Sequence, residues 1–435
     1  MNLLQVFRRK IFWFFDTLKG NDIKKHYKDI KELIENPDSQ YTIDRKNKYL
    51  QQILEHAVST TWFYQKHAGY NSITDFPVID KNMIRDNFDE FRSSKYKANN
   101  CILVSTSGST GAPFSVLQNM SKRCRNTGDN LYFSNRSGYE IGQKLLYVKI
   151  WPDNYSHNIF SKFWWQNIVP HSVFKLSDKE IEILINRLRK DSLKKSFLGY
   201  TSAFATICKY LDKTNTKPIE SNVQSVITMS EGLNDYVRRS MKKYFGVNPV
   251  SRYSNNENGI LAQEDRNIPF RFIVNSASYF IEIFNLEKDI TVSYGERGRI
   301  VVTDLHNYAM PLIRYDTGDI GAMDLDENNV PYLSSIEGRK LDLIYNTKGE
   351  IVPSHVSYKL CKYGEYKQFQ LVQHGEKDYL IKLNTDNKVD ERKMLEEYKG
   401  YFGKDANIKI EYVDEIPLLS SGKRREVTNT YHSQL

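Results

Sequence analysis

Hydrophobic positions along the first hundred residues recur with the period of an α-helix. Residues 1–20 place apolar side chains on one helical face, made by Leu4, Phe7, Ile11, Phe14, Phe15 and Leu18. The helical pattern continues from Asn21 to about Asn100, and Pro77 interrupts it because proline cannot donate to a helical hydrogen bond. We therefore expect the first part of the chain to be mainly helical.

Between residues 144 and 253 short apolar runs alternate with amphipathic segments. Strands are predicted over Lys144–Ile150, Phe197–Tyr200, Ser225–Met229 and Pro249–Tyr253. One helix is predicted to begin at the capping box Ser177–Glu180, a second to follow the strand Phe197–Tyr200 up to about Leu211, and a third over Asn234–Phe245. This order favours parallel strands with crossover helices, so a ligand is expected beyond the carboxyl ends of the strands.

The remaining chain turns to extended segments, including Ile281–Phe284 and Arg299–Asp304. A short link, Glu337–Arg339, precedes a final stretch of about 95 residues, a length that suits a small domain. That stretch reads as paired strands, a helix and a further strand: Gln368–Val372, Tyr379–Leu383, Arg392–Tyr401 and Ile408–Val413. We expect an α/β protein with two domains, residues 1–337 and residues 338–435, the second a small α+β domain.

Composition narrows the classes of function. The formal net charge is +9, but basic and acidic residues are interleaved, so no nucleic-acid-binding stripe is expected. The four cysteines lack Cys-x-x-Cys spacing and the nine histidines lack His-x-x-x-His spacing, which indicates neither a zinc site nor a disulfide framework. Free thiols fit a reducing cytosol.

Residues 1–20 allow two interpretations. They carry Arg8, Arg9 and Lys10 mostly off the apolar stripe, which is typical of a helix that lies on an anionic membrane. The segment is too short and too charged to span a bilayer, and no small-residue cleavage site follows. The other interpretation is a terminal helix packed on the core, and we favour it because any surface helix needs an apolar face.

Five polar stretches stand out, and the first is Val104–Phe114, a Ser/Thr/Gly-rich segment after a short apolar run. Its glycines and hydroxyls could bring donors close to phosphate oxygens, although it lacks the Gly-Lys-Ser/Thr of a Walker loop. The other four are Tyr253–Glu257, Arg314–Asp319, Gly338–Asp342 and Ser420–Arg425. Each alone also fits an ordinary loop, turn, hinge or basic tail.

Taken in this order, the five stretches resemble the motifs of the adenylate-forming superfamily, which includes acyl-CoA synthetases, adenylation domains and luciferases. The likeness is strongest to the phenylacetate–CoA ligase branch and its CapK-type relatives in capsule biosynthesis. It also covers Thr61–Tyr64, Phe76–Lys81 and Gly199–Ser202, and so spans about residues 60–425. The resemblance implies a large N-terminal α/β body of several subdomains with a small, mobile α+β C-terminal lid.

The resemblance also implies roles for individual residues. The phosphate loop would be Ser107, Gly108, Ser109, Thr110 and Gly111, and the adenine-side turn would be Ser230, Glu231 and Gly232. Glu257 would hold Mg²⁺, Asp319 with Arg339 would bind the ribose, and Lys423 would bridge the carboxylate and the α-phosphate. Tyr253 would lie near the adenine, and Asn256 would replace the usual hydroxyl residue. We place the acyl pocket at Ile150, Trp151, Tyr200 and Thr201.

Two departures from the superfamily pattern matter. Pro113-Phe114 ends the phosphate loop where many members carry a lysine, which leaves Lys423 as the principal catalytic cation. Leu341 stands where many members have an acidic or lysine hinge residue for the rotation between half-reactions.

The expected activity is ATP-dependent activation of a carboxylic acid to an acyl-adenylate, followed by transfer to CoA or an amine. ATP and Mg²⁺ are the implied cofactors, with CoA if the acceptor is a thiol, and a role in capsule or other surface polysaccharide biosynthesis is implied. The alternatives are a catalytically silent protein of this fold that acts as a scaffold at the membrane surface, and a basic membrane- or nucleic-acid-binding module. We expect a cytoplasmic protein, peripheral to the inner face of the membrane if residues 1–20 bind lipid.

Overall fold

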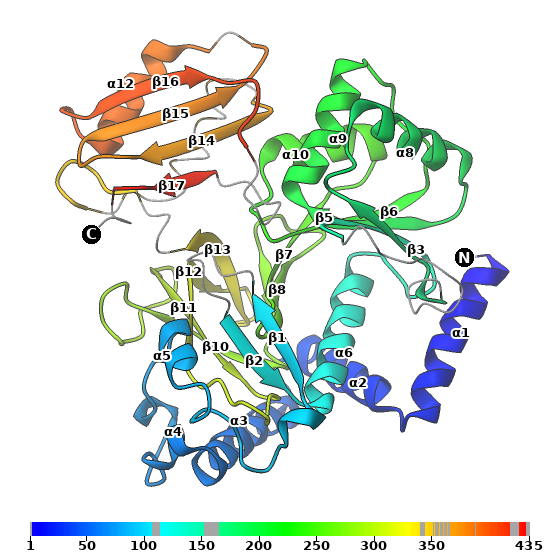
Figure 1. Ribbon diagram of the computed structural model, residues 1–435, viewed down its shortest axis with the longest axis vertical. Coiled ribbons are helices and arrows are strands. Elements are labelled where there is room, and N and C mark those ends of the chain that lie inside the picture. The colour runs from blue at the N-terminus through cyan, green and yellow to red at the C-terminus, as the bar shows by residue number, and fades with distance from the viewer. Residues whose placement is uncertain are drawn as a thin grey trace. The chain divides into compact units, whose positions relative to one another are not determined.

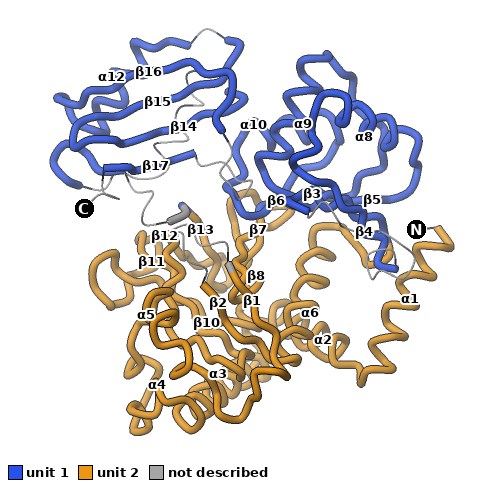
Figure 2. The backbone as a smooth tube through the Cα atoms, in the orientation of Figure 1, with its two compact units in different colours: residues 1, 143–251, 337–435 blue, residues 2–142, 252–336 orange. Residues whose placement is uncertain are grey.

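The computed structural model describes residues 2–106, 114–151, 165–339, 344–350, 352, 356, 360, 363, 366–387, 389–417 and 426–431. The chain forms two compact units, which Figure 2 distinguishes by colour. Unit 1 comprises residues 143–251 and 337–435, and unit 2 comprises residues 2–142 and 252–336. The two predicted domains, residues 1–337 and 338–435, stay a prediction. The compact units are defined by contacts within the structure, whereas a domain is a part that can fold independently.

Unit 2 begins with helices, as the period of its hydrophobic residues predicts. They are α1 (Leu3–Leu18), α2 (Asp22–Glu35), α3 (Gln40–Thr60), α4 (Trp62–Gln65), α5 (Lys81–Asp86) and α6 (Met120–Arg136). Helices α2 and α6 approach closely at Gly128, where an added Cβ would lie 3.0 Å from Ile30 Cδ1. Their shared core includes Ile30, Leu33, Tyr132 and Phe133.

Helix α1 differs from the packed terminal helix that we favoured from sequence. Its apolar stripe is exposed, with Phe7 55% and Phe14 60% accessible, whereas its buried residues are the polar Gln5 and Asp16. The expectation of a core-facing apolar stripe is therefore wrong, because polar contacts with neighbouring segments hold the other side of the helix. In the described part of the chain no helix is long and apolar enough to cross a membrane.

The strands of unit 2 make a short hairpin and a mainly antiparallel sheet. The hairpin joins β1 (Ile102–Thr106) to β2 (Phe114–Gln118), with Ile102 opposite Gln118 and Thr106 opposite Phe114. The sheet strands are β7 (Val250–Asn255), β8 (Gly259–Glu264), β9 (Phe272–Val274), β10 (Tyr279–Phe284), β11 (Arg297–Asp304), β12 (Tyr315–Leu325) and β13 (Pro331–Arg339). Neighbouring strands follow the order β7-β8-β9-β13-β12-β11-β10, and the first two residues of β7 and the last three of β13 belong to unit 1.

The first segment of unit 1 has the predicted parallel strands. Strands β3 (Lys144–Lys149), β4 (Ile168–Ser172), β5 (Lys195–Tyr200) and β6 (Val223–Met229) pair in parallel in the order β4-β3-β5-β6. Helix α8 (Asp178–Lys190) connects β4 to β5, α9 (Thr201–Lys213) connects β5 to β6, and α10 (Asp235–Phe245) follows β6; the three helices lie together in Figure 1. Strand β4 was not predicted, because its sequence contains Pro170; β4 is the edge strand of this group, where proline is tolerated.

The second segment of unit 1 is the expected small α+β fold. Its strands β14 (Gln368–Gln373), β15 (Asp378–Asn384), β16 (Asn407–Tyr412) and β17 (Val427–Asn429) follow the order β16-β15-β14-β17. Helix α12 (Glu391–Phe402) buries Met394, Tyr398 and Phe402, which recur every four residues, and the Phe402 ring stacks on Tyr379 with 4.2 Å between centroids. The mobility of this segment as a lid stays a prediction.

Candidate active site

The predicted acyl-pocket residues of unit 1 follow the carboxyl ends of neighbouring parallel strands. Gly199 lets β5 approach β3 closely, because an added Cβ would lie 2.6 Å from the Val148 carbonyl oxygen. Tyr200, the last residue of β5, hydrogen-bonds the Ile150 backbone, and burial raises the pKa of its hydroxyl. Trp151 donates from Nε1 to the Tyr147 carbonyl at 2.9 Å. The structure thus brings Ile150 and Tyr200 together, with Trp151 beside them in sequence.

Glu231 ties the predicted adenine-side turn to the start of α9. Its carboxylate accepts a hydrogen bond from the Ser202 backbone N–H at 2.6 Å and another from the Ser202 hydroxyl at 2.9 Å. Its carbonyl accepts from Thr201 Oγ1 at 3.3 Å. Ser230 has a φ of +69°, a strained value for a residue with a side chain, and strain of this kind clusters at ligand sites. The turn Ser230–Gly232 follows β6 directly, as predicted.

Glu257 in unit 2 lies in the turn between β7 and β8, with its side chain only 2% exposed. The turn is held by the Asn258 backbone N–H, which donates to Asn255 Oδ1 at 2.9 Å. Gln118 Nε2 donates to the Glu257 carbonyl at 2.7 Å and fixes its backbone from the end of β2. A buried carboxylate needs a hydrogen-bond donor or a cation, so its partners indicate what the site can bind.

Those partners are a tyrosine and a lysine. The Tyr315 hydroxyl donates to Glu257 Oε1 at 2.7 Å, and Lys81 Nζ lies 3.3 Å from the same oxygen. Burial and the Glu257 charge raise the pKa of Tyr315 well above its usual value, so the hydroxyl stays protonated and donates. The sequence analysis gives neither Tyr315 nor Lys81 a role, although Tyr315 lies in the stretch Arg314–Asp319 and Lys81 in the stretch Phe76–Lys81.

The backbone explains how Lys81 reaches Glu257. Ile79 forms a parallel β-bridge with Tyr315, in which Ile79 N–H donates to the Arg314 carbonyl at 3.0 Å and Asp316 N–H to the Ile79 carbonyl at 2.8 Å. Helix α5 then begins at Lys81 with the Asp80 side chain as its cap. Lys81 Nζ also lies 5.9 Å from the centre of the Phe114 ring, at the start of β2.

Asp319 is presented by an irregularity in β12. Val301 pairs with Asp316 and Arg299 with Ile320, so Thr317, Gly318 and Asp319 bulge out of the β11–β12 register. Gly318 has a φ of +79°, and its N–H donates to Asp316 Oδ1 at 2.8 Å. The predicted tight Thr-Gly turn therefore exists as a bulge within a strand, a common way to aim a side chain beside a binding site.

The Tyr253 hydroxyl connects β7 to this bulge. It donates to Asp319 Oδ2 at 2.8 Å, and burial together with the Asp319 charge raises the pKa of Tyr253 well above its usual value. The Glu257 and Asp319 carboxylates both contribute to the raised pKa of Tyr315. Unit 2 thus gathers three of the predicted nucleotide-site residues, Tyr253, Glu257 and Asp319, and the protonated hydroxyls of Tyr253 and Tyr315 donate to the two carboxylates.

Asn256 is exposed, and its Nδ2 donates to the Ser105 carbonyl at 3.4 Å, near the end of β1. The predicted phosphate loop Ser107–Gly111 follows β1 and, like Leu341 and Lys423, lies outside the described residues. Arg339 ends strand β13, and its side chain is likewise outside the described part of the structure. Their predicted roles stay predictions.

The donor set of this site fits Mg²⁺ bound together with a nucleotide. Within the described residues no group of three or more His, Cys, Asp or Glu side chains could hold a metal by itself. Mg²⁺ is commonly held by one or two carboxylates together with phosphate oxygens and water. Glu257 supplies one such buried carboxylate, and the flexible, partly exposed Lys81 is the cation that pairs with it in this structure.

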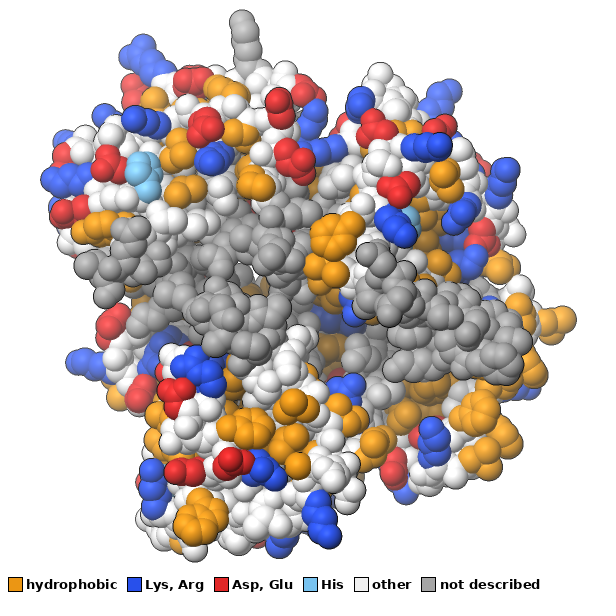
Figure 3. Space-filling view, in the orientation of Figure 1, with side chains coloured by type: hydrophobic (Ala, Val, Ile, Leu, Met, Phe, Trp, Pro, Cys, Tyr) orange, Lys and Arg blue, Asp and Glu red, His pale blue; other side chains and the backbone are white. Residues whose placement is uncertain are grey.

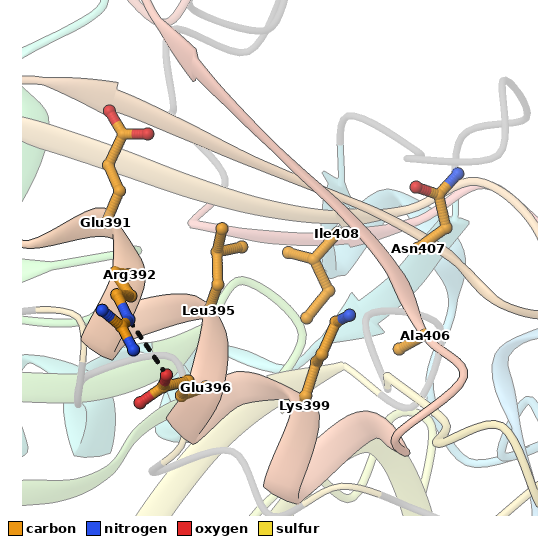
Figure 4. A pocket seen from close by; sticks show the side chains of 8 residues that line it. All are labelled: Glu391, Arg392, Leu395, Glu396, Lys399, Ala406, Asn407 and Ile408. Atoms are coloured by element: carbon orange, nitrogen blue, oxygen red, sulfur yellow. Dashed lines mark hydrogen bonds and ion pairs between the residues drawn. The ribbon is translucent and has the colours of Figure 1, made fainter.

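A separate pocket of about 580 Å³ lies between α12 and β16 (Figure 4). Arg392 and Glu396 form an ion pair at its edge with 3.3 Å between Nε and Oε1, and Leu395 and Ile408 supply apolar lining. None of its lining residues belongs to the predicted site, and its charged side chains are those of an ordinary solvated helix face.

Comparisons with known proteins bear on the relatives and the fold of this chain. Residues 343–430 match the family model of the CapK C-terminal domain. The chain is 24% identical to protein CapK of Staphylococcus aureus over 456 aligned residues, which cover 98% of this chain and 96% of CapK. A solved structure of 2-hydroxyisobutyryl-CoA ligase in complex with 2-HIB-AMP superposes with a TM-score of 0.69 at 16% identity, covering 91% of this chain and 92% of the ligase.

The chain has the adenylate-forming ligase fold. ATP-bound MatB of Rhodopseudomonas palustris shares it with a TM-score of 0.55 at 17% identity, over 77% of this chain and 68% of MatB. The predicted fold class and the resemblance to the adenylate-forming superfamily and its CapK-type relatives are therefore confirmed. The finer likeness to phenylacetate–CoA ligase stays a prediction.

Proposed function

We propose that this adenylate-fold protein is an ATP-dependent ligase that activates a carboxylic acid as an acyl-adenylate and passes the acyl group to CoA or an amine. The observation that carries the proposal is the buried Glu257 carboxylate, which Tyr315 and Lys81 hold close to the Tyr253–Asp319 pair. The fold that it shares with CoA ligases supports the same reaction class.

In the first half-reaction a carboxylate oxygen of the acid attacks the α-phosphorus of ATP. The new oxygen–phosphorus bond replaces the bond to pyrophosphate, which leaves. Two anions meet in this step, so the site must supply positive charge and fixed donors rather than a general base. Mg²⁺, when bound, neutralises phosphate charge and polarises the phosphorus–oxygen bonds.

The chain's own residues then have these proposed roles. Glu257 would hold the metal, and Asp319, oriented by the Tyr253 hydroxyl, would accept hydrogen bonds from the ribose hydroxyls. Ser230–Gly232 contacts the adenine, and Ile150, Trp151, Tyr200 and Thr201 line the acyl pocket. The resemblance implies that Ser107–Gly111 binds the phosphates. It also implies that the positive charge of Lys423 bridges the substrate carboxylate and the α-phosphate.

In the second half-reaction the acceptor's sulfur or nitrogen attacks the acyl carbonyl. AMP leaves with the electron pair of the carbon–oxygen bond, and the acceptor's proton passes to solvent. The 2-hydroxyisobutyryl-CoA ligase has been solved with 2-HIB-AMP and CoA together, which supports CoA as the first acceptor to test. We place the reaction in capsule or other surface polysaccharide biosynthesis, with support from the similarity to CapK along 98% of this chain.

Acid-dependent exchange of labelled pyrophosphate into ATP tests the first half-reaction directly. A panel of aryl, fatty, amino and sugar acids should include at least one that supports exchange. Lys423→Ala should abolish that exchange and leave ATP binding nearly intact, whereas Lys404→Ala, at an exposed lysine, should behave as the parent. Equal exchange in Lys423→Ala and parent would remove the assigned role. Silence of the folded parent with every acid would favour the scaffold at the membrane surface.

A further inference from the structure

Helix α1 of unit 2 presents an unusually apolar surface to solvent. Its outward side chains are large, and Leu3, Phe7, Phe14 and Leu18 are 90%, 55%, 60% and 66% exposed. Leu4 and Phe15 are also about half exposed. Figure 3 shows hydrophobic side chains gathered over the position of α1, with basic side chains among them. We call this set, Leu3, Leu4, Phe7, Phe14, Phe15 and Leu18, the α1 face.

The opposite side of α1 is held by polar contacts. Asp16 is buried and caps α2, accepting from Ile23 N–H at 3.0 Å and Lys24 N–H at 2.9 Å. Arg9 Nη1 lies 3.0 Å from Glu140 Oε2. Gly142 packs against the helix backbone so closely that an added Cβ would lie 2.4 Å from the Gln5 carbonyl oxygen. These contacts, together with the Trp13 ring against Tyr27 at 6.0 Å between centroids, anchor the helix and keep the α1 face outward.

Basic residues border the α1 face. At about 100° per residue the apolar positions span an arc of about 120°, and Lys10 and Arg8 each lie about 20° beyond one edge of it. Counting the C-cap Lys19, the segment carries four cations, Arg8, Arg9, Lys10 and Lys19, against the single carboxylate of Asp16. The whole chain has a net charge of +9, which attracts it to anionic surfaces at longer range.

We propose that the α1 face docks on the surface of an anionic lipid bilayer, with α1 lying in the plane of the interface. Phenylalanine and leucine on one face, with flanking arginine and lysine, are what such helices use to enter the headgroup region. With 16 residues α1 is about 24 Å long, too short to span the hydrocarbon core of about 30 Å. A second copy of the chain is a poorer occupant, because a twofold contact would bring the two basic borders together.

Sedimentation of the full-length protein with lipid vesicles tests the proposal. The parent should pellet with vesicles of phosphatidylcholine and phosphatidylglycerol at low salt, and bind weakly to pure phosphatidylcholine. Binding should fall as salt rises, because the basic border acts through screened charges. Phe7→Glu with Phe14→Glu should abolish binding, whereas Trp62→Glu with Phe174→Glu, at side chains 80% and 66% exposed elsewhere, should leave it unchanged.

Two double variants with the same change in net charge test how much the basic border contributes to vesicle binding. Lys10→Glu with Lys19→Glu should weaken binding at least about 25-fold, since each basic residue near an anionic surface contributes about five-fold. Lys404→Glu with Lys409→Glu changes the net charge equally at other exposed positions and should have a much smaller effect. Circular dichroism on every variant separates loss of binding from loss of fold.

Three results would overturn the proposal. One is a parent that stays in the supernatant with anionic vesicles at low salt. Another is binding that the Phe7/Phe14 variant retains. The third is a parent dimer in light scattering that the same variant converts to a monomer, which would make a second copy the occupant. ATP is absent from all these assays, so the outcome is independent of the ligase activity.

Discussion

At the scale of single residues, Glu257 shares one carboxylate oxygen between a hydroxyl and an ammonium. Burial and the Glu257 charge raise the pKa of Tyr315, so its hydroxyl stays protonated and donates, whereas the Lys81 side chain is 37% exposed and flexible. The two partners therefore differ in kind. Tyr315 fixes the position of the carboxylate, whereas Lys81 can be replaced by a metal ion, which is also positively charged.

Replacing Lys81 tests this exchange. Lys81→Met should lower the free energy of unfolding by about 1–2 kcal/mol without ligand, because a buried carboxylate loses a charged partner. Addition of Mg²⁺ and ATP should raise the thermal midpoint of the variant by more than that of the parent, because the metal restores the lost charge. Thermal unfolding with Mg²⁺–ATP and with ATP and EDTA measures both effects.

The matched control is Lys213→Met, which breaks the exposed pair between Lys213 and Asp178. It should change stability by less than about 1 kcal/mol and show the parent's response to Mg²⁺–ATP. If Lys81→Met responds to Mg²⁺–ATP no more than the parent does, Glu257 is not the metal ligand.

Two aspartates at one bulge, Asp319 within it and Asp316 directly before it, distinguish nucleotide binding from structural support. Asp319→Asn should weaken ATP binding by about 10–100-fold, because hydrogen bonds to a charged group contribute about 1.5–3 kcal/mol. Asp316→Asn loses the 2.7 Å contact with Arg299 Nη1 and should lower stability while leaving ATP affinity close to the parent's. Isothermal titration with ATP gives the affinities. Equal weakening in both variants would show that the bulge as a whole, and not the Asp319 carboxylate, sets the affinity.

At the scale of elements, the contact between β5 and β3 depends on the absence of a side chain at Gly199. Gly199→Ala places a methyl group 2.6 Å from a backbone carbonyl and 2.9 Å from Val148 Cβ, neither of which can rotate away. The substitution should cost about 1–3 kcal/mol of stability, and it should raise the acid concentration needed for pyrophosphate exchange because Tyr200 and Thr201 follow directly.

Gly400→Ala in α12 is the comparison, because an added Cβ there meets nothing within 4 Å. It should be neutral or stabilise the protein by up to about 1 kcal/mol, as alanine favours helix more than glycine does. Thermal unfolding ranks the two variants. Similar midpoints for both would show that β5 can move away from β3 at little cost.

At the scale of the whole molecule, stability should fall in mild acid. Burial, together with the charge of Arg125, lowers the pKa of His26 to about 4, although the carboxylates of Asp29 and Asp22 oppose this shift. Burial also lowers the pKa of His306. The two imidazole rings lie 6.1 Å apart. Above pH 6.5 both folded and unfolded chains hold them neutral, so no penalty arises.

As pH falls below 6.5, the unfolded chain binds protons that the folded chain excludes. Each such histidine then reduces the free energy of unfolding by up to about 1.4 kcal/mol per pH unit, for His26 down to about pH 4. His26→Gln should flatten this dependence. Urea unfolding between pH 7.5 and 5 measures the slopes, and equal slopes for parent and His26→Gln would contradict the assignment.

Much of the architecture could be predicted from the sequence, because local patterns encode it. The period of apolar residues located the helices of unit 2 and the alternation over 144–253, and strands β3, β5, β6 and β7 occur where expected. The edge strand β4 is not predicted from the sequence, because Pro170 interrupts its hydrophobic pattern. Strand β17 is not predicted either, because three residues are too few to form such a pattern. The polar stretches in their order also indicated the ligase superfamily.

The composition of the candidate site could be predicted only in part, because side-chain partners are set by contacts between distant segments. Lys81 reaches Glu257 through the bridge from Ile79 to Tyr315, a pairing that joins residues more than two hundred positions apart in the chain. Asp319 faces Tyr253 because a bulge breaks the β11–β12 register. No local pattern reports either event.

Helix α1 shows the same limit most clearly. Residues 3–18 by themselves determine an amphipathic helix, since the spacing of leucine and phenylalanine follows from helix geometry. Which side of the helix faces the protein was decided only in the tertiary structure. The capping of α2 by Asp16, the Arg9–Glu140 pair and the close approach of Gly142 hold one side of the helix and leave the α1 face to solvent.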